Sequence, residues 1–180
     1  MSYAVGRARR EDYGHEYPFD YDRRHALSLV GEYRIGPRLS LSLTGRVASG
    51  FPLTPAVGVR VAANEDGSDL DGDGDREERI PARDSSGSLI YAPDFGGLAT
   101  LNSARLPLFA RFDARLTFRP GGATGRWLLY VDVINLLNRD NAGRMSYVVQ
   151  RSLGSDQPGL IESRIASIPL LPSFGVRFRF

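Results

Sequence analysis

The sequence contains no cysteine and no lysine. The missing cysteine excludes a disulfide framework and any cysteine-ligated metal. All 23 basic residues are arginines, scattered along the chain among 21 acidic residues, so the formal net charge is only +2. A nucleic-acid-binding domain concentrates its basic residues in a patch or stripe, so we do not expect nucleic acid as a partner.

The sequence also lacks an apolar run of the roughly 18 residues that a membrane helix requires. No signal peptide follows Met1, because Ser2–Asp12 carries charges where the apolar core of a signal would lie. A hydrophobic fraction of 42% nevertheless favours a folded chain over a disordered one. If the strands described below form a membrane barrel, the chain must be exported, so either an upstream part that directs export is missing or the barrel interpretation is wrong.

Catalytic motifs are absent as well. The only two histidines, His15 and His25, do not have a metal-ligand spacing such as HExxH. There is no GxSxG serine motif, and the glycine-rich stretch Pro120–Gly125 lacks the Gly-Lys-Ser ending of a phosphate-binding loop. We do not expect an enzyme.

What the sequence does contain is repeated alternation of apolar and polar residues, the pattern of β-strands with two different faces. In Phe109–Arg119 one face carries Phe112, Ala114, Leu116 and Phe118, and the other carries arginine, aspartate and threonine. The same alternation occurs in Ser2–Arg9, His25–Ile35, Arg38–Ala48, Trp127–Leu137 and Phe174–Phe180. These segments predict about six strands. Several have ten or more residues, whereas strands of soluble proteins average about five or six.

The connections between these strands alternate in length. Gly36-Pro37 and Pro120–Gly125 predict tight turns, whereas long loops are expected at about 50–106 and about 139–171. Within the second loop, Tyr147–Arg151 and Ile161–Ser167 are candidates for a hairpin that extends the neighbouring strands. Outer-membrane β-barrels have short turns on one side and long loops on the other. The predicted fold is therefore all-β, an up-and-down antiparallel membrane barrel of which this chain supplies about six strands.

In such a barrel the apolar side chains face lipid and the charged ones face the water-filled interior. The expected lumen-facing residues are Arg111, Asp113, Arg115, Arg177 and Arg179. A water-soluble antiparallel sheet with one buried face would show the same alternation. The alternative hypothesis is therefore a small self-contained β-barrel or β-sandwich with a structural or interaction role and a calcium-binding acidic loop.

Several segments resemble the C-terminal region of TonB-dependent receptors of the type with a carboxypeptidase-regulatory-like N-terminal domain. They are Phe19–Leu27, Ser49–Pro55, Asp71–Asp75 with Arg79–Pro81, Phe109–Arg115 and Val131–Arg139, and the aromatic last residue Phe180 also fits. The segments occur in the expected order along nearly the whole chain. The resemblance implies a 22-stranded barrel, plugged by an N-terminal domain, that takes up a scarce nutrient with energy from TonB.

By this resemblance, residues 1–180 form a single barrel segment without a plug domain, located in the outer membrane of a Gram-negative cell. The expected partners are outer-membrane lipid, the remaining strands and plug of a parent protein, and TonB only through that plug. The last strand, with Phe174, Val176, Phe178 and Phe180, resembles the signal read by the barrel-assembly machinery. Transport itself belongs to the parent architecture.

One acidic segment is a candidate calcium site. Asp69, Asp71, Asp73 and Asp75 alternate with Leu70, Gly72 and Gly74, as in loops that gather carboxylate ligands for Ca²⁺. Ile80 stands where such loops carry a bidentate glutamate, and Glu77 or Glu78 would have to replace it. The alternative is a solvated acidic loop on the outer side of the barrel.

Overall fold

The computed structural model of the chain describes residues 1–64, 80–151, 158–165 and 168–180. Regular structure in these residues consists of antiparallel strands and two 3₁₀ turns, η1 (Leu98–Thr100) and η2 (Gly122–Thr124). The prediction of an all-β antiparallel fold is confirmed. The chain divides into two compact units: Met1–Leu53, Asn102–Met145 and Arg164–Phe180 form the first, and Thr54–Leu101 with Ser146–Ser163 form the second.

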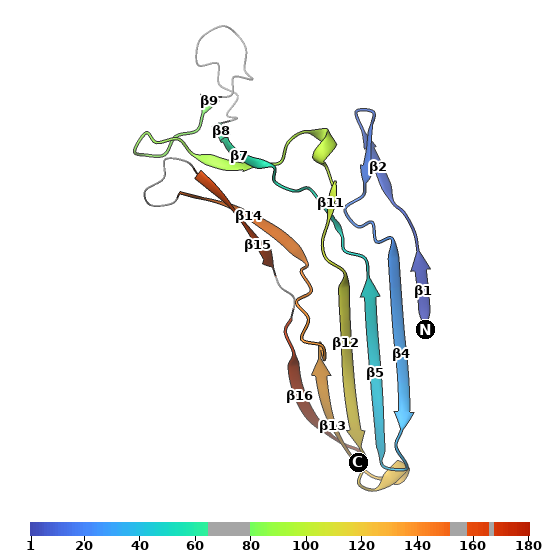
Figure 1. Ribbon diagram of the computed structural model, residues 1–180. Helices are drawn as coiled ribbons and strands as arrows, with labels where there is room; N and C mark the ends of the chain where they lie inside the picture. The colour runs from blue at the N-terminus through green and yellow to red at the C-terminus, as the bar shows by residue number, and fades with distance from the viewer. Residues whose placement is uncertain (65–79, 152–157, 166–167) are drawn as a thin grey trace. The chain divides into compact units, whose positions relative to one another are not determined.

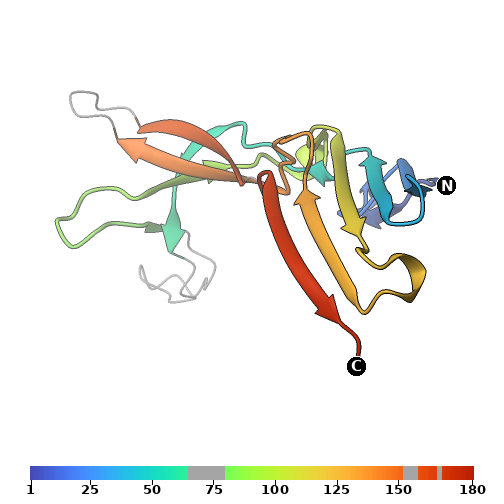
Figure 2. The ribbon, with the colours of Figure 1, turned by 90° about the horizontal axis from the view of Figure 1, so that it is seen from below.

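A six-stranded sheet is the main element of the first unit. Its strands, in spatial order, are β1 (Ser2–Val5), β4 (His25–Arg34), β5 (Leu39–Ala48), β12 (Phe109–Phe118), β13 (Trp127–Ile134) and β16 (Leu171–Phe178). Spatial order follows chain order and every neighbouring pair is antiparallel, so the sheet is an up-and-down meander (Figure 1). Seen from its tight-turn end, it forms one layer that runs from β1 to β16 (Figure 2). Each lies within or across a segment that the alternation predicted, but β1 ends at Val5 rather than Arg9, and β16 begins at Leu171 and ends at Phe178.

The connections leave the sheet in the predicted short–long order. β4 and β5 are joined by Ile35–Arg38, and β12 and β13 by Arg119–Arg126, both at the lower end in Figure 1. Gly36 (φ 96°) and Gly122 (φ 64°) adopt the left-handed conformation that these tight turns need. The three longer connections, β1 to β4, β5 to β12 and β13 to β16, all start at the opposite end of the sheet.

Two of the long connections contain further strands of the first unit. β2 (Arg9–Asp12) and β3 (His15–Pro18) form a hairpin whose two turn residues, Tyr13 (φ 51°) and Gly14 (φ 74°), both have positive φ, as in a type I′ turn. The alternation pattern did not reveal this hairpin. β6 (Pro52–Leu53) pairs with β11 (Ala104–Arg105).

The second unit holds the pair β7 (Gly58–Val61) with β10 (Tyr91–Asp94) and the pair β8 (Ala63–Asn64) with β9 (Ile80–Pro81). The loop expected at about 50–106 therefore contains the short strands β6 to β11. The loop expected at about 139–171 contains the hairpin of β14 (Arg144–Arg151) and β15 (Pro158–Ile165), close to the positions suggested by the sequence.

Few apolar side chains are buried. The buried hydrophobic residues among those described are Tyr17, Ala48, Ala82, Leu106 and Ala110, three of which are alanines. The buried polar residues include Asp22, Ser40, Asn102, Thr117, Asn135 and Asn141. Within the described ranges, no helix is both long enough and apolar enough to span a membrane.

Candidate functional site

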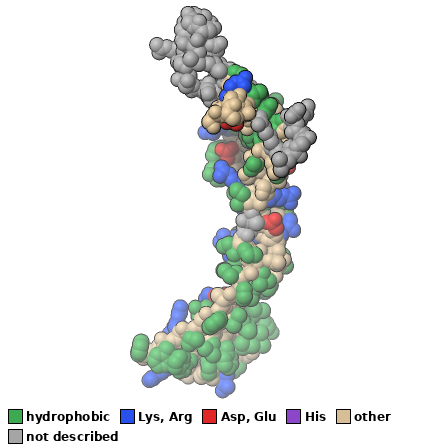
Figure 3. Space-filling view, turned by 90° about the vertical axis from the view of Figure 1, so that its left-hand side faces the viewer, with side chains coloured by type: hydrophobic (Ala, Val, Ile, Leu, Met, Phe, Trp, Pro, Cys, Tyr) green, Lys and Arg blue, Asp and Glu red, His purple; other side chains and the backbone are tan. Residues whose placement is uncertain are grey.

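Most large apolar side chains of the six-stranded sheet lie on one face, and many of them are exposed. Strand register aligns Tyr33, Leu41, Leu116, Val131 and Phe174 in one row across five strands. A second row contains Leu39, Phe118, Leu129 and Val176. In these rows Phe174 is 86% exposed and Leu116 is 42% exposed. Figure 3 shows hydrophobic side chains gathered over the lower part of the sheet, with basic side chains at the borders.

The opposite face of the sheet carries the charges. On β12, Arg111, Asp113 and Arg115 alternate with the apolar residues. Asp132 of β13 is paired with Arg115 and therefore lies on this face, as does Leu128, four residues earlier on the same strand. Arg177 of β16 is paired with Leu128, so it lies on the charged face as well. Arg179 follows two residues later with the same parity. The residues expected to face a lumen thus share one face of the sheet.

Two of these arginines, Arg111 and Arg115, pair with carboxylates within the sheet. Nε of Arg111 donates to Oδ1 of Asp113 at 2.8 Å. Nε and Nη2 of Arg115 donate to the two carboxylate oxygens of Asp132 on the neighbouring strand, at 2.5 and 2.7 Å. The Arg115 guanidinium also lies 4.6 Å from the centre of the Tyr130 ring. Asp132 was not among the predicted site residues, because its segment is apolar on both faces and the cross-strand register was unknown.

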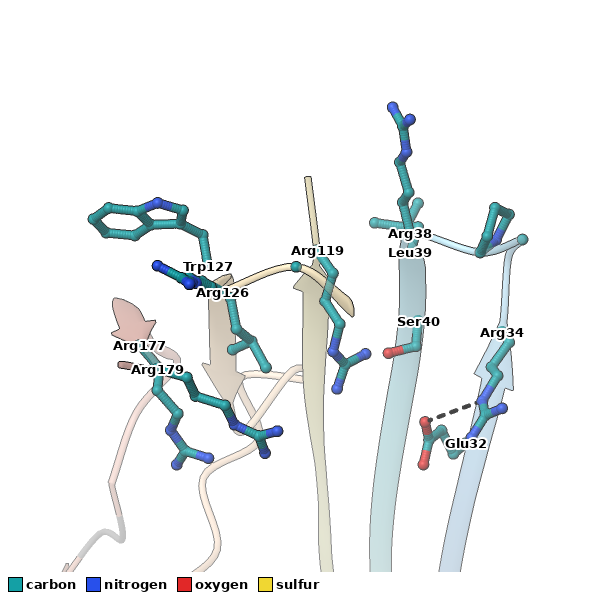
Figure 4. A pocket seen from close by; sticks show the side chains of 14 residues that line it. Glu32, Arg34, Arg38, Leu39, Ser40, Arg119, Arg126, Trp127, Arg177 and Arg179 are labelled. Atoms are coloured by element: carbon teal, nitrogen blue, oxygen red, sulfur yellow. Dashed lines mark ion pairs between the residues drawn. The ribbon is translucent and has the colours of Figure 1, made fainter. Parts of the chain in front are cut away.

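At the tight-turn end, the charged face becomes strongly basic. Here an open hollow of about 500 Å³ is bordered by one glutamate, Glu32, and six arginines: Arg34, Arg38, Arg119, Arg126, Arg177 and Arg179. In Figure 4 the Arg119, Arg177 and Arg179 side chains extend to the same side of the strands as Ser40 and Glu32, whereas Arg38 extends away. Of these six arginines, only Arg177 and Arg179 were among the predicted lumen-facing residues, although the alternation also places Arg34 and Arg119 on the polar faces of their strands.

At the long-connection end, the segments that carry the family resemblance contact one another. The Asp22 carboxylate is 2% exposed and accepts hydrogen bonds from the Ala8 N–H (2.8 Å) and from the Arg105 guanidinium. Arg105 also donates to the Asp22 and Gly50 carbonyls, at 2.8 and 3.2 Å. The neighbouring Arg23 guanidinium lies over the Phe51 ring, 4.0 Å from its centre.

Opposing effects act on the pKa of Asp22. The largest single effect is burial, which raises the pKa. Together, the hydrogen bonds from Ala8 and Arg105 and the positive charges of Arg105 and Arg24 outweigh it, so the pKa lies below its usual value of 3.8. Asp22 is therefore ionised at neutral pH. By accepting hydrogen bonds from Arg105, it connects the segment that precedes β4 to the segment that precedes β12.

Two buried asparagines hold the chain after β13. Asn135 is 0% exposed, and its side-chain amide donates to the Arg139 and Ile168 carbonyls, both at 3.0 Å. Asn141 bonds both the N–H and the carbonyl of Ala110, at 2.8 and 2.9 Å. Asn135 and Asn141 therefore have a structural role. Their side chains form hydrogen bonds with backbone groups at the end of the sheet.

The remaining predicted sites lie as follows. The candidate calcium ligands Asp69, Asp71, Asp73 and Asp75 lie outside the described residues. Among the described residues, no group of three or more acidic or histidine side chains is arranged to hold a metal ion. Phe174, Val176 and Phe178 lie on the apolar face of β16, and Phe180 follows the strand, with its ring 5.4 Å from that of Phe178.

Comparison with known proteins found no match: no family model, no curated protein and no solved structure matches the chain.

Proposed function

We propose that the chain forms six consecutive wall strands at the C-terminal end of a TonB-dependent outer-membrane receptor, which takes up a scarce nutrient. The observation that carries the proposal is the distribution of side chains on the sheet. Its apolar face is exposed across neighbouring strands, and its opposite face carries charged side chains, two of which, Arg111 and Arg115, pair with carboxylates within the sheet. This is the distribution expected of a wall between lipid and a water-filled interior.

The dimensions of the strands support a membrane location. β4, β5 and β12 each have ten residues. At about 3.4 Å per residue each is about 34 Å long, and a tilt of about 40° reduces its height to about 26 Å. The apolar band of an outer-membrane barrel is about 25 Å tall. β4, β5 and β12 are therefore long enough to cross it, whereas β13 and β16, with eight residues each, span about 21 Å and β1 has only four residues.

The resemblance supports the narrower assignment to TonB-dependent receptors. Its segments Phe19–Leu27 and Ser49–Pro55 contribute Asp22 and Gly50 to one hydrogen-bonded junction through Arg105. Its segment Val131–Arg139 contributes Asn135, which is fully buried. These three segments therefore contribute buried polar contacts at the long-connection end of the sheet, which supports a structural role for the residues that carry the resemblance.

The proposal implies partners along the edges and faces of the sheet. Lipid contacts the apolar face, and further strands and a plug of the parent protein complete the barrel. The barrel-assembly machinery would recognise β16 and its aromatic side chains by strand pairing. The transported solute is not assigned, because transport requires the complete receptor.

Cysteine scanning tests the proposal, because the chain has no cysteine of its own. Single cysteines at Leu41, Ser42, Leu43 and Thr44 of β5 are labelled with a fluorophore after the parent receptor that carries this chain has been folded into phosphatidylcholine bilayers. We expect brominated lipid to quench labels at positions 41 and 43, and a water-soluble quencher to quench labels at positions 42 and 44. Equal access of the water-soluble quencher to all four would favour the alternative, a self-contained soluble β-protein.

A further inference from the structure

The basic hollow at the tight-turn end has a property that membrane insertion does not explain. Its border carries six arginines against one glutamate, and without Arg38, whose side chain extends away, an excess of four formal positive charges remains. The ion pair found there among the described residues joins Arg34 and Glu32 at 4.0 Å, and both side chains are more than half exposed. Such a pair contributes little. The basic hollow therefore has an uncompensated positive charge.

Three arginines of the basic hollow differ in their distance from carboxylates from two arginines elsewhere on the charged face. Farther along this face, Arg111 and Arg115 each contact a carboxylate within 2.8 Å. Within the described ranges, Arg119, Arg177 and Arg179 have no carboxylate within 4.0 Å. Placing like charges on neighbouring strands costs free energy, and a negatively charged occupant would offset that cost.

From this charge and geometry we infer that the basic hollow binds a dissolved oxyanion with two or more negative charges, of the phosphate or pyrophosphate class. Guanidinium groups present paired N–H donors that match the spacing of phosphate oxygens. The volume of about 500 Å³ lies within the usual range of small-molecule sites, roughly 300–1,000 Å³.

The character of the lining favours a small dissolved anion over a lipid or a peptide. The arginines lie on the charged face of the sheet, whereas Leu39, Phe118 and Trp127 point to the opposite face. A lipid phosphate would reach the apolar face first. A bound peptide would need apolar pockets, and in Figure 4 the large ring of Trp127 extends away from the hollow. The inference requires only the charged face of the sheet and holds whether or not the sheet spans a membrane.

The test is titration calorimetry of the full chain in a nonionic detergent with pyrophosphate, phosphate and chloride. We expect pyrophosphate to bind most tightly and its affinity to fall as salt is raised, because salt screens the attraction. The triple variant Arg119→Gln, Arg177→Gln, Arg179→Gln should bind pyrophosphate at least about tenfold more weakly, since each lost charge-assisted hydrogen bond contributes substantially.

The matched control is Arg7→Gln, Arg60→Gln, Arg164→Gln, which removes the same charge from three exposed arginines outside the basic hollow. It should change the affinity by less than about twofold. An equal loss in both triple variants would show that only net charge matters and would overturn the inference. The absence of pyrophosphate binding would also overturn it.

A second measurement avoids any variant that fails to fold. Phenylglyoxal modifies accessible arginines of the unaltered chain, and peptide mass spectrometry locates each modified residue. Pyrophosphate should protect Arg119, Arg177 and Arg179 but not Arg7 or Arg60. Uniform protection, or none, contradicts the inference. Lipid quenching of the cysteine series does not depend on the anion, so failure of the membrane proposal would be recognised separately.

Discussion

The two faces of the sheet can be compared by placing one arginine on each, at adjacent positions of β5. Leu43 lies on the apolar face opposite Gly31 and Ala114, and Thr44 lies on the charged face opposite Asp113. Leu43 is midway between Leu39 and Val47, which are the first and last apolar positions of the strand. These eight steps of about 3.4 Å, tilted by about 40°, span about 21 Å of membrane. Leu43 is therefore near the midplane.

The position determines the expected cost. An arginine on the lipid face at the midplane destabilises a barrel by about 2–4 kcal/mol, so Leu43→Arg should lower the free energy of unfolding by that amount. In Thr44→Arg the new guanidinium can reach the Asp113 carboxylate and remains in the wet interior. That variant should stay within about 1 kcal/mol of the parent.

The assay is urea unfolding of the parent receptor that carries this chain, folded into phosphatidylcholine vesicles and followed by the far-UV circular dichroism of its strands. Equal destabilisation by the two variants, or a larger effect of Thr44→Arg, would refute the assignment of faces. The neighbouring pair Leu116 and Thr117 is a poorer choice. Thr117 is only 7% exposed, so a large side chain there would add steric strain to any effect of facing.

Three further predictions concern other parts of the chain. In water without detergent the chain should aggregate or oligomerise, because Phe174 is 86% exposed within an apolar face; a monodisperse monomer with cooperative melting would contradict this. Asp22→Asn should cost about 2 kcal/mol, since it weakens charge-assisted hydrogen bonds to a buried carboxylate. Because the pKa of Asp22 is lowered on folding, its contribution is present above the usual value of 3.8 and is lost as the pH falls through the lowered pKa. Urea unfolding across this range should therefore show a shallower acid dependence in the variant. If the acidic loop binds Ca²⁺, replacing Asp71 and Asp73 with asparagine should abolish binding; no calorimetric heat with millimolar Ca²⁺ for the unaltered chain would refute a calcium site.

Much of the sheet could be predicted because its determinants are local. A β-strand alternates its side chains between two faces, so a stretch such as Phe109–Phe118 reveals both its conformation and its amphipathicity. The tight turns were also predictable, because Gly36 and Gly122 mark places where the backbone needs a positive φ. The β2–β3 hairpin escaped detection because its strands have only four residues each, and its turn signal is the less specific Tyr13-Gly14.

The sequence by itself determined which residues share a strand face, because that depends only on residue parity within each segment. Only the tertiary structure decided which charges meet, because pairing depends on the register between strands. Register placed Arg115 opposite Asp132, and long-range contacts brought Arg105 to Asp22, 83 residues away in the chain. Strand pairing also brought together the arginines of the basic hollow, which belong to different strands and turns of the meander.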